Sequence, residues 1–382
     1  MNPAVEALEP SVIRTLNARK RPSSIDLGLG EPTLRPDPAL FERATARVAA
    51  EGCRYSPAPG LQDLREAIAR HYAYPGMDRA ENVCVTTGSQ EAVYVALRCV
   101  LDPARDELLI VSPTFTIYGK IAEVEGIPFR TVEIDPRGED PFDPEAILGA
   151  IGPKTRLIAI CSPCNPTGTV MSRGSARRLA EGLLARGGEP IVVLHDEIYR
   201  ELVYTDDVAE IARVYPHTIA INSLSKSNAL TGLRIGWAIA PTAIIAQMVK
   251  LHGLATSCPN TFSQYVASEV FAANALAVQR PWYAAQRTAA LAALDEIGLD
   301  YIVPEGAFYA CVRVDGTDTR SFAFELIEKR DVVAIPGDLF SPRLAGWLRA
   351  SFVAPPPQLR EGFARIASFS HELGSVLCGR SQ

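Results

Sequence analysis

Residues 219–240 read IAINSLSKSNALTGLRIGWAIA, in which apolar runs at 219–222 and 237–240 flank a polar loop that carries Lys226. Hydroxyl side chains precede this lysine, and Arg234 follows it eight residues later. An amine so placed can form an imine with an aldehyde, while hydroxyls and a guanidinium hold phosphate oxygens. The stretch therefore predicts two buried strands joined by a loop suited to an aldehyde ligand that also bears a phosphate.

Four more short apolar runs precede this unit, and each is continuously apolar rather than alternating. They lie at 83–87, 108–112, 157–161 and 191–195. Continuous apolarity is typical of strands buried on both faces. Helical periodicity lies between the runs, as after Gly88, where Ala92, Val93, Ala96 and Leu97 recur at intervals of three and four. The alternation predicts an α/β domain with a mostly parallel sheet flanked by helices.

The pattern changes after about residue 280. Helices are expected at 282–297, 321–329 and 358–373, and strands at 307–314 and 347–352. A chain of 382 residues is too long for one ordinary core. We therefore expect a large domain over residues 36–280 and a smaller α+β domain that includes residues 281–382.

The bulk composition argues against several classes of protein. Basic residues number 38 and acidic residues 44, and the trio at 19–21 is the one basic cluster, so no nucleic-acid partner is expected. No apolar run approaches the roughly 18 residues of a membrane span, and residues 1–21 lack a signal-peptide core, so we expect a cytoplasmic protein. Cys161 and Cys164 have metal-ligand spacing but no companion pair, so no metal is expected.

Polar groups that could bind a ligand follow or end three further predicted strands. Asp196 ends a buried run, where an ionised carboxylate is costly unless it meets a cation. Gly88, Ser89 and Gln90 join a strand to a helix, which leaves free amides and the positive end of a helix dipole for a phosphate. Asn165 lies in a turn rich in proline and glycine.

Six motifs in one order carry a family resemblance. They are TTGSQE at 86–91, SPTFTIY at 112–118, SPCNPTG at 162–168, VLHDEIY at 193–199, NSLSK at 222–226 and TGLRIGW at 231–237. Over about residues 27–352 the chain resembles the fold-type I, class I/II aminotransferases that depend on pyridoxal 5'-phosphate (PLP). The resemblance implies that residues 1–35 pack with the small domain.

The resemblance also implies a role for each matching residue. Lys226 would hold PLP as a Schiff base and then shuttle the α-proton of the substrate. Asp196 would pair with the pyridine nitrogen, Tyr199 and Asn165 would lie at the phenolic oxygen, and Phe115 would stack on the ring. The residues implied at the phosphate are Gly88, Ser89, Gln90, Ser223 and Arg234, and Ser225 either joins them or only packs.

Substrate contacts follow from two more motifs. LGLGEP at 27–32 would place Gly30 over the substrate, and WLRASF at 347–352 would place Arg349 on the α-carboxylate beside Asn165. RYSPAPG at 54–60 would bring Tyr55 to the partner's phosphate in a homodimer. The resemblance suggests a side-chain pocket of Thr33, Thr256, Ser257, Asn260 and Phe308. No clear second arginine is present, although Arg35 or Arg200 could serve, so neutral or aromatic amino acids are favoured over aspartate.

The expected reaction is transfer of the α-amino group of an amino acid to a 2-oxo acid. The same residues also serve C–S lyases, ring-forming synthases, cyclases, decarboxylases and amino-acid oxidases on this fold. A non-catalytic PLP-sensing domain is a more remote alternative, because no helix-turn-helix segment precedes residue 27.

Overall fold

The apolar runs between residues 83 and 240 come together in one sheet of seven strands. The structure is a computed structural model, and it describes residues 1, 3–314 and 318–379. The sheet order is β2, β8, β7, β6, β5, β3 and β4. The bounds are β2 Val83–Thr86, β3 Glu107–Ser112, β4 Phe129–Glu133, β5 Thr155–Cys161, β6 Val192–Asp196, β7 Thr218–Ser223 and β8 Gly236–Ile239. β8 is antiparallel to both neighbours and the other pairs are parallel, so the sheet is mostly parallel, as predicted.

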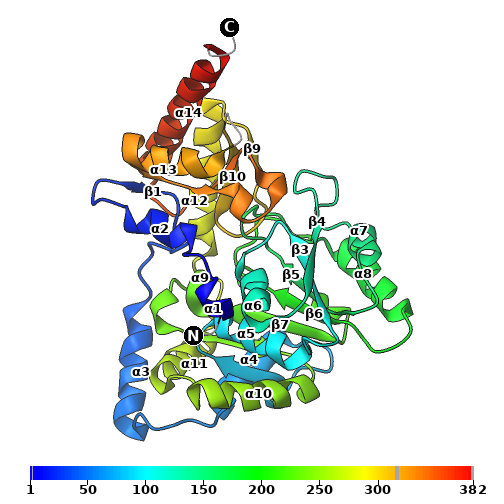
Figure 1. The fold of residues 1–382 in the computed structure, drawn as a ribbon. Helices are drawn as coiled ribbons and strands as arrows, with labels where there is room; N and C mark the ends of the chain where they lie inside the picture. Colours follow the sequence, from blue (N-terminus) through cyan, green and yellow to red (C-terminus); the bar gives the residue numbers. More distant parts are fainter. Residues whose placement is uncertain (2, 315–317, 380–382) are drawn as a thin grey trace.

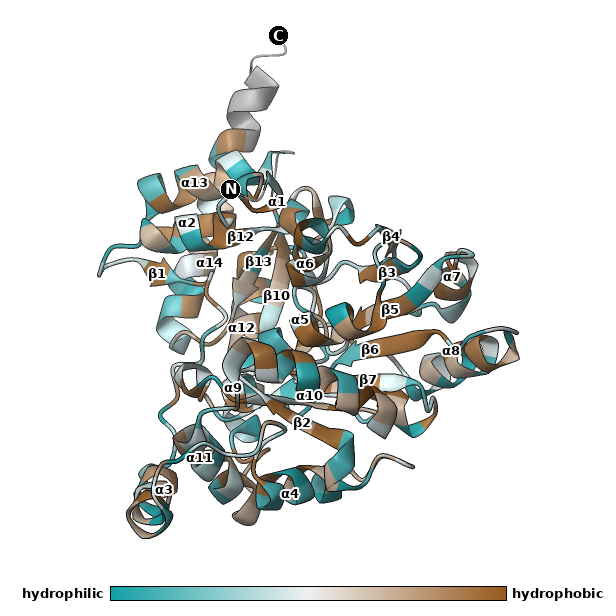
Figure 2. Ribbon diagram, turned by 60° about the horizontal axis from the view of Figure 1, so that its bottom comes forward, coloured by the Kyte–Doolittle hydropathy of each residue, from teal (hydrophilic) through white to brown (hydrophobic). Residues whose placement is uncertain are grey.

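Helices cover both faces of this sheet (Figures 1 and 2). On β5, Leu157 and Ala159 pack toward α5, α6 and α10, whereas Ile158 and Ile160 pack toward α7 and α8. A third cluster joins β2 and β8 to α3, α4 and α11. The bounds are α3 Pro38–Glu51, α4 Gln62–Tyr72, α5 Ser89–Val100, α6 Ile117–Glu125, α7 Pro144–Gly149, α8 Arg173–Ala185, α10 Thr242–Thr256 and α11 Thr261–Ala272. Two covered faces explain why the strands are apolar at successive positions.

The C-terminal part builds a second sheet, which is antiparallel in the order β12, β13, β10 and β9. The bounds are β9 Tyr301–Ile302, β10 Tyr309–Arg313, β12 Ile335–Pro336, β13 Trp347–Ser351, α12 Arg280–Ile297, α13 Thr319–Arg330 and α14 Pro356–Gly379. α14 begins inside the run of prolines at 355–357, two residues before the helix that was expected from residue 358. Proline is tolerated there because the N–H groups of the first helical turn have no acceptor within the helix, so the N–H that proline lacks is not needed.

The N-terminal segment lies against this second sheet and its helices (Figure 1). β1 (Ile25–Asp26) pairs in parallel with β11 (Val332–Val333). Leu16 from α2 (Val12–Ala18) and Leu27 are fully buried in the same hydrophobic cluster as the C-terminal helices. The preceding α1 (Pro3–Glu6) instead contacts α6 of the large sheet. The N-terminal segment therefore joins the second sheet and its helices to α6 on the large sheet, and it crosses the carboxyl ends of the large sheet's parallel strands.

Candidate active site

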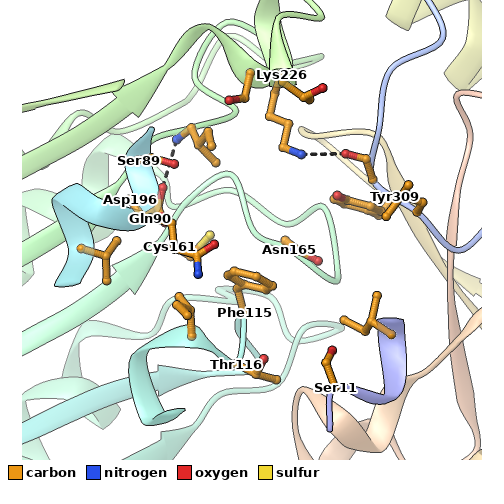
Figure 3. A pocket seen from close by; sticks show the side chains of 18 of the residues that line it. Ser11, Ser89, Gln90, Phe115, Thr116, Cys161, Asn165, Asp196, Lys226 and Tyr309 are labelled. Atoms are coloured by element: carbon orange, nitrogen blue, oxygen red, sulfur yellow. Dashed lines mark hydrogen bonds between the residues drawn. The ribbon is translucent and has the colours of Figure 1, made fainter. Parts of the chain in front are cut away.

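A cavity of about 800 Å³ lies where the parallel strands end, between the two sheets and the N-terminal segment. Its volume is in the range of small-molecule sites, which open α/β sheets hold at the carboxyl ends of their strands. Figure 3 shows Lys226, Asp196, Phe115 and Tyr309 around this space. The predicted site residues that line it are Gly30, Ser89, Gln90, Phe115, Asn165, Asp196, Tyr199, Lys226, Arg234 and Arg349.

Lys226 lies in the short helix α9 (Leu224–Ser227), directly after β7. Its Nζ donates a hydrogen bond of 2.6 Å to the carbonyl oxygen of Gly30, which the N-terminal segment supplies. Burial and the positive charge of Arg349 lower the pKa of the Lys226 amine to about 8. A larger fraction of this amine is therefore unprotonated near neutral pH than for an exposed lysine, as a nucleophile or base requires.

Asp196 is the last residue of β6, and 6% of its surface is exposed. Its Oδ2 accepts a hydrogen bond of 2.7 Å from the Tyr118 hydroxyl, and its Oδ1 accepts one of 3.3 Å from the Ile198 amide. Within the described residues the carboxylate forms no ion pair, and burial raises its pKa. A buried carboxylate on the wall of a cavity, without a cation of its own, suits a ligand that brings a positive charge.

Arg349 projects from β13 and is 3% exposed. Its Nη1 donates to Oδ1 of Asn165 at 2.9 Å, and its Nη2 donates to the Gly28 carbonyl at 2.6 Å. The guanidinium also lies 4.4 Å from the centroid of the Tyr309 ring. It pairs with no carboxylate in the described part of the chain, so a ligand carboxylate would meet an oriented and otherwise unneutralised cation.

Tyr309 is a cavity residue that the sequence did not reveal. Its hydroxyl lies 3.1 Å from the hydroxyl of Tyr199, and a β-carbon added to Gly30 would lie 1.9 Å from it. The sequence had instead pointed to the preceding residue, Phe308, which is fully buried and stacks on Tyr283. Neighbouring residues at a strand point to opposite sides, so a shift of one position exchanges core and cavity.

The cradle for an anion is built around Gly88 at the start of α5. Gly88 has a φ of 80°, and a β-carbon there would lie 2.5 Å from Nη2 of Arg234. Ser89 and Gln90 form the first turn of α5, whose amides have no partners within the helix. Arg234 is held by a 2.9 Å hydrogen bond from Nη1 to the carbonyl of Thr231. The glycine is required because a side chain would occupy the space of the guanidinium.

Ser223 differs from its expected position. It is 1% exposed and caps α9, where its hydroxyl oxygen accepts a hydrogen bond of 3.1 Å from the Ser225 amide. Ser225, and not Ser223, lies on the cavity lining. The Ser223 oxygen is thus occupied as an acceptor, while its hydrogen is still available to a ligand.

Tyr55 does not reach the cavity of its own chain. It is 91% exposed, on the segment between α3 and α4. The resemblance-based pocket residues Thr33, Thr256, Ser257 and Asn260 are also absent from the described cavity lining. Asn260 instead caps α11 through the Ser263 amide, and Thr33 donates to the Val353 carbonyl. These residues were expected at the substrate side chain, and within one chain they are not there.

The two arginines considered for a second carboxylate also lie elsewhere. Arg200 forms ion pairs of 2.7 Å with Glu201 and 3.2 Å with Glu210, so its charge is already neutralised. Arg35 is exposed and lies outside the lining. Another part of the cavity lining, here called the far wall, comes from α2 and the start of α6. Its residues are Ser11, Ile13, Arg14, Asn17, Thr116, Ile117 and Lys120. Thr116 and Ile117 belong to the SPTFTIY motif at 112–118, and no quoted motif contains the other five residues.

Together these groups define a class of enzyme. A lysine of lowered pKa, a buried carboxylate without a cation and an amide-lined cradle face one cavity, and they match the aldehyde, ring nitrogen and phosphate of PLP. The sequence model for aminotransferase class I and II matches residues 22–366. The chain belongs to the class I and II aminotransferase family.

Individual relatives agree with this assignment. The chain is 33% identical to an aspartate aminotransferase of Pyrococcus horikoshii over 94% of each protein. It is 29% identical to aromatic-amino-acid aminotransferase 2 of Thermococcus litoralis, over 95% of this chain and 96% of the relative. The solved structure of Thermus thermophilus aspartate aminotransferase with maleate has a TM-score of 0.87 and 28% identity, and the match covers 97% of this chain and 99% of that one. The chain is therefore a PLP-dependent aminotransferase of fold type I, which transfers an amino group between an amino acid and a 2-oxo acid.

Proposed function

We propose that the cavity holds PLP on Lys226 and that amino-group transfer takes place there. The proposal rests on two groups that line the same cavity. One is the Lys226 amine, with a pKa of about 8, and the other is the buried Asp196 carboxylate, which forms no ion pair with a described residue. When bound, PLP supplies a ring that withdraws the electron pair left at the substrate's Cα. The residues of this chain determine where that ring lies and where the proton goes.

The contacts to PLP are proposed from the positions of the side chains. Asp196 pairs with the ring nitrogen and keeps it protonated, Phe115 lies against the ring, and Tyr199 and Asn165 serve the phenolic oxygen. The residues proposed at the phosphate are Ser89, Gln90, Ser225 and Arg234 from the cavity lining, with Gly88 and Ser223 outside that lining. Their amides, hydroxyls and guanidinium are the groups that bind phosphate oxygens well.

The substrate is proposed to lie between Arg349 and Lys226. Arg349 binds the α-carboxylate, and Asn165 and the backbone of Gly30 hold the carboxylate in contact with the guanidinium. Once the amino group of the substrate has displaced it from the cofactor, the freed Lys226 amine would take the proton from Cα and deliver it to the cofactor carbon, so one residue would act as base and then as acid. Its lowered pKa suits both steps near neutral pH.

The side-chain preference is proposed from the far wall. Ile13 and Ile117 give this wall an apolar part, which supports neutral or aromatic amino acids. Arg14 lies on the same wall and forms no ion pair with a described residue, and this favours a second candidate, a dicarboxylic amino acid. The two candidates are separated by the assay below.

We propose a homodimer in which Tyr55 reaches the partner's phosphate site. Its 91% exposure supports this, because the side chain is accessible to a second copy of the chain. We also propose domains of 36–280 and of 1–35 with 281–382, supported by the shared cluster around Leu16 and Leu27. A cytoplasmic location is supported by the seven described cysteines, all of them free thiols.

The test is a half-reaction with one amino acid at a time. Purified protein loaded with PLP is mixed with single neutral, aromatic, acidic and basic amino acids, and the products are identified by mass. Transamination predicts pyridoxamine phosphate and the matching 2-oxo acid in equal amounts. A panel in which no amino acid gives both products would contradict the proposed reaction.

A further inference from the structure

The Tyr118 side chain lies behind the proposed cofactor site, outside the cavity lining. Tyr118 belongs to α6, the helix that follows β3, and it is fully buried in the cluster between α6 and the large sheet. Its hydroxyl donates a hydrogen bond of 2.7 Å to Oδ2 of Asp196. A helix of the protein's outer layer thus contacts the one carboxylate on the cavity wall.

The surroundings of that hydroxyl leave it one strong acceptor. Cys161 is the neighbour of Asp196 across the β5–β6 pair, and Figure 3 shows the two side by side. The Cys161 thiol interacts with the same Tyr118 hydroxyl, and burial raises its pKa, so it stays a thiol. Because sulfur is a weak acceptor, the Tyr118 hydrogen is directed to the carboxylate.

The carboxylate itself depends on few groups. Besides Tyr118, its other recorded hydrogen bond comes from the Ile198 amide at 3.3 Å, a long contact. The titratable groups that act on Asp196 are Tyr118 from α6, Cys161 and Cys164 from β5 and the turn after it, its chain neighbours His195 and Glu197, and Lys226 from α9. Of these, the Tyr118 hydroxyl is the short, direct donor to the carboxylate oxygens.

We propose that Tyr118 is a positioning residue that orients the Asp196 carboxylate toward the ring nitrogen of PLP. The inference rests on the proposed function. The hydroxyl holds Oδ2 and stabilises the ionised form, so the remaining lone pairs face the cavity in a fixed direction. Without the hydroxyl, the carboxylate can rotate, and its buried charge loses its best donor.

The test replaces Tyr118 by phenylalanine, which keeps the packed ring and removes the donor. The matched control is Tyr94→Phe on α5, because the Tyr94 hydroxyl donates at 2.7 Å to another carboxylate, that of Glu125, at the surface. The measurements are the dissociation constant of PLP, the pH midpoint of the bound cofactor's absorbance change, and the separate values of kcat and KM. These readouts separate positioning from a general loss of stability.

Tyr118→Phe is expected to weaken PLP binding about tenfold to a hundredfold, the range for losing a hydrogen bond to a charged group. It should also shift the absorbance midpoint and lower kcat with little change in KM. Tyr94→Phe should change none of these values. Wild-type PLP affinity and midpoint in Tyr118→Phe, or equal changes in both variants, would overturn the inference.

A second comparison works without cofactor, so failure of the proposed function is seen separately. In the PLP-free protein, thermal stability is measured for Tyr118→Phe, Asp196→Asn and the double variant. If the hydroxyl serves the carboxylate, its removal costs much less in the Asp196→Asn background, and a fold lost in Tyr118→Phe returns. Equal costs in both backgrounds would overturn the inference, whereas a wild-type protein that binds no PLP refutes only the proposed function.

Discussion

Replacing Arg349 by lysine keeps the positive charge at the substrate end of the cavity and removes the forked guanidinium. In the native protein two N–H groups hold the Asn165 side chain and the Gly28 carbonyl, and the others remain for a carboxylate. A lysine ammonium cannot keep both protein acceptors and also bind a carboxylate through two hydrogen bonds. At least one charged hydrogen bond to the substrate is lost, which costs about 1.5–3 kcal/mol.

That cost corresponds to a loss of about 10- to 150-fold in kcat/KM, at about 1.4 kcal/mol for each factor of ten. The assay is the single-turnover half-reaction with an amino acid and with the matching amine that lacks the carboxylate. In Arg349→Lys, the half-reaction of the amino acid should lose most of its rate advantage over that of the amine. The amine itself should react within about threefold of its wild-type rate, a change that is small compared with the effect of one lost hydrogen bond. An equal loss for both compounds would show that Arg349 supports the fold rather than the carboxylate.

Three further outcomes follow from the site. In the PLP-free protein, the rate of PLP attachment should rise with pH through about 8, because the protonated Lys226 amine cannot attack; a midpoint above 10 would contradict the lowered pKa. Gly88→Ala should weaken PLP binding because its β-carbon meets Arg234, while Gly76→Ala, with a similar φ of 70° and open space, should leave affinity unchanged, and equal affinities would contradict the cradle. A mixed dimer of Tyr55→Ala and Lys226→Ala subunits should regain one intact site, as measured by turnover, because one subunit lends its tyrosine to the other; no recovery would place Tyr55 in its own chain.

The sequence was most informative where the chain is buried on both faces. The runs around Ile158 and Val193 are continuously apolar because helices cover each side of their strands. β4 was not predicted, since it lies at the sheet edge and Phe129, Arg130 and Thr131 are exposed. The sequence of β4, FRTVE, shows neither a continuous apolar run nor an alternation of apolar and polar residues.

The residues of the site also fall into those that the sequence predicts and those that it does not. Lys226, Asp196 and Asn165 follow strands whose carboxyl ends must meet, so local motifs were enough to bring them together. Tyr309 and Ile13 reach the site from other parts of the chain, and no local motif marks them. Tyr118 ends the SPTFTIY motif, but its contact with Asp196 depends on tertiary packing that the motif does not reveal. The resemblance suggested Phe308 rather than Tyr309, and the side chains of these two neighbours point to opposite sides.

The identity of the cofactor lysine is tested most directly by borohydride reduction of the PLP-loaded protein, followed by peptide mapping. If Lys226 holds PLP, the protein carries one phosphopyridoxyl label, on Lys226, and a Lys226→Ala variant treated in the same way carries none. A label on another lysine, or an unlabelled wild-type protein that had bound PLP, would show that Lys226 does not hold the cofactor.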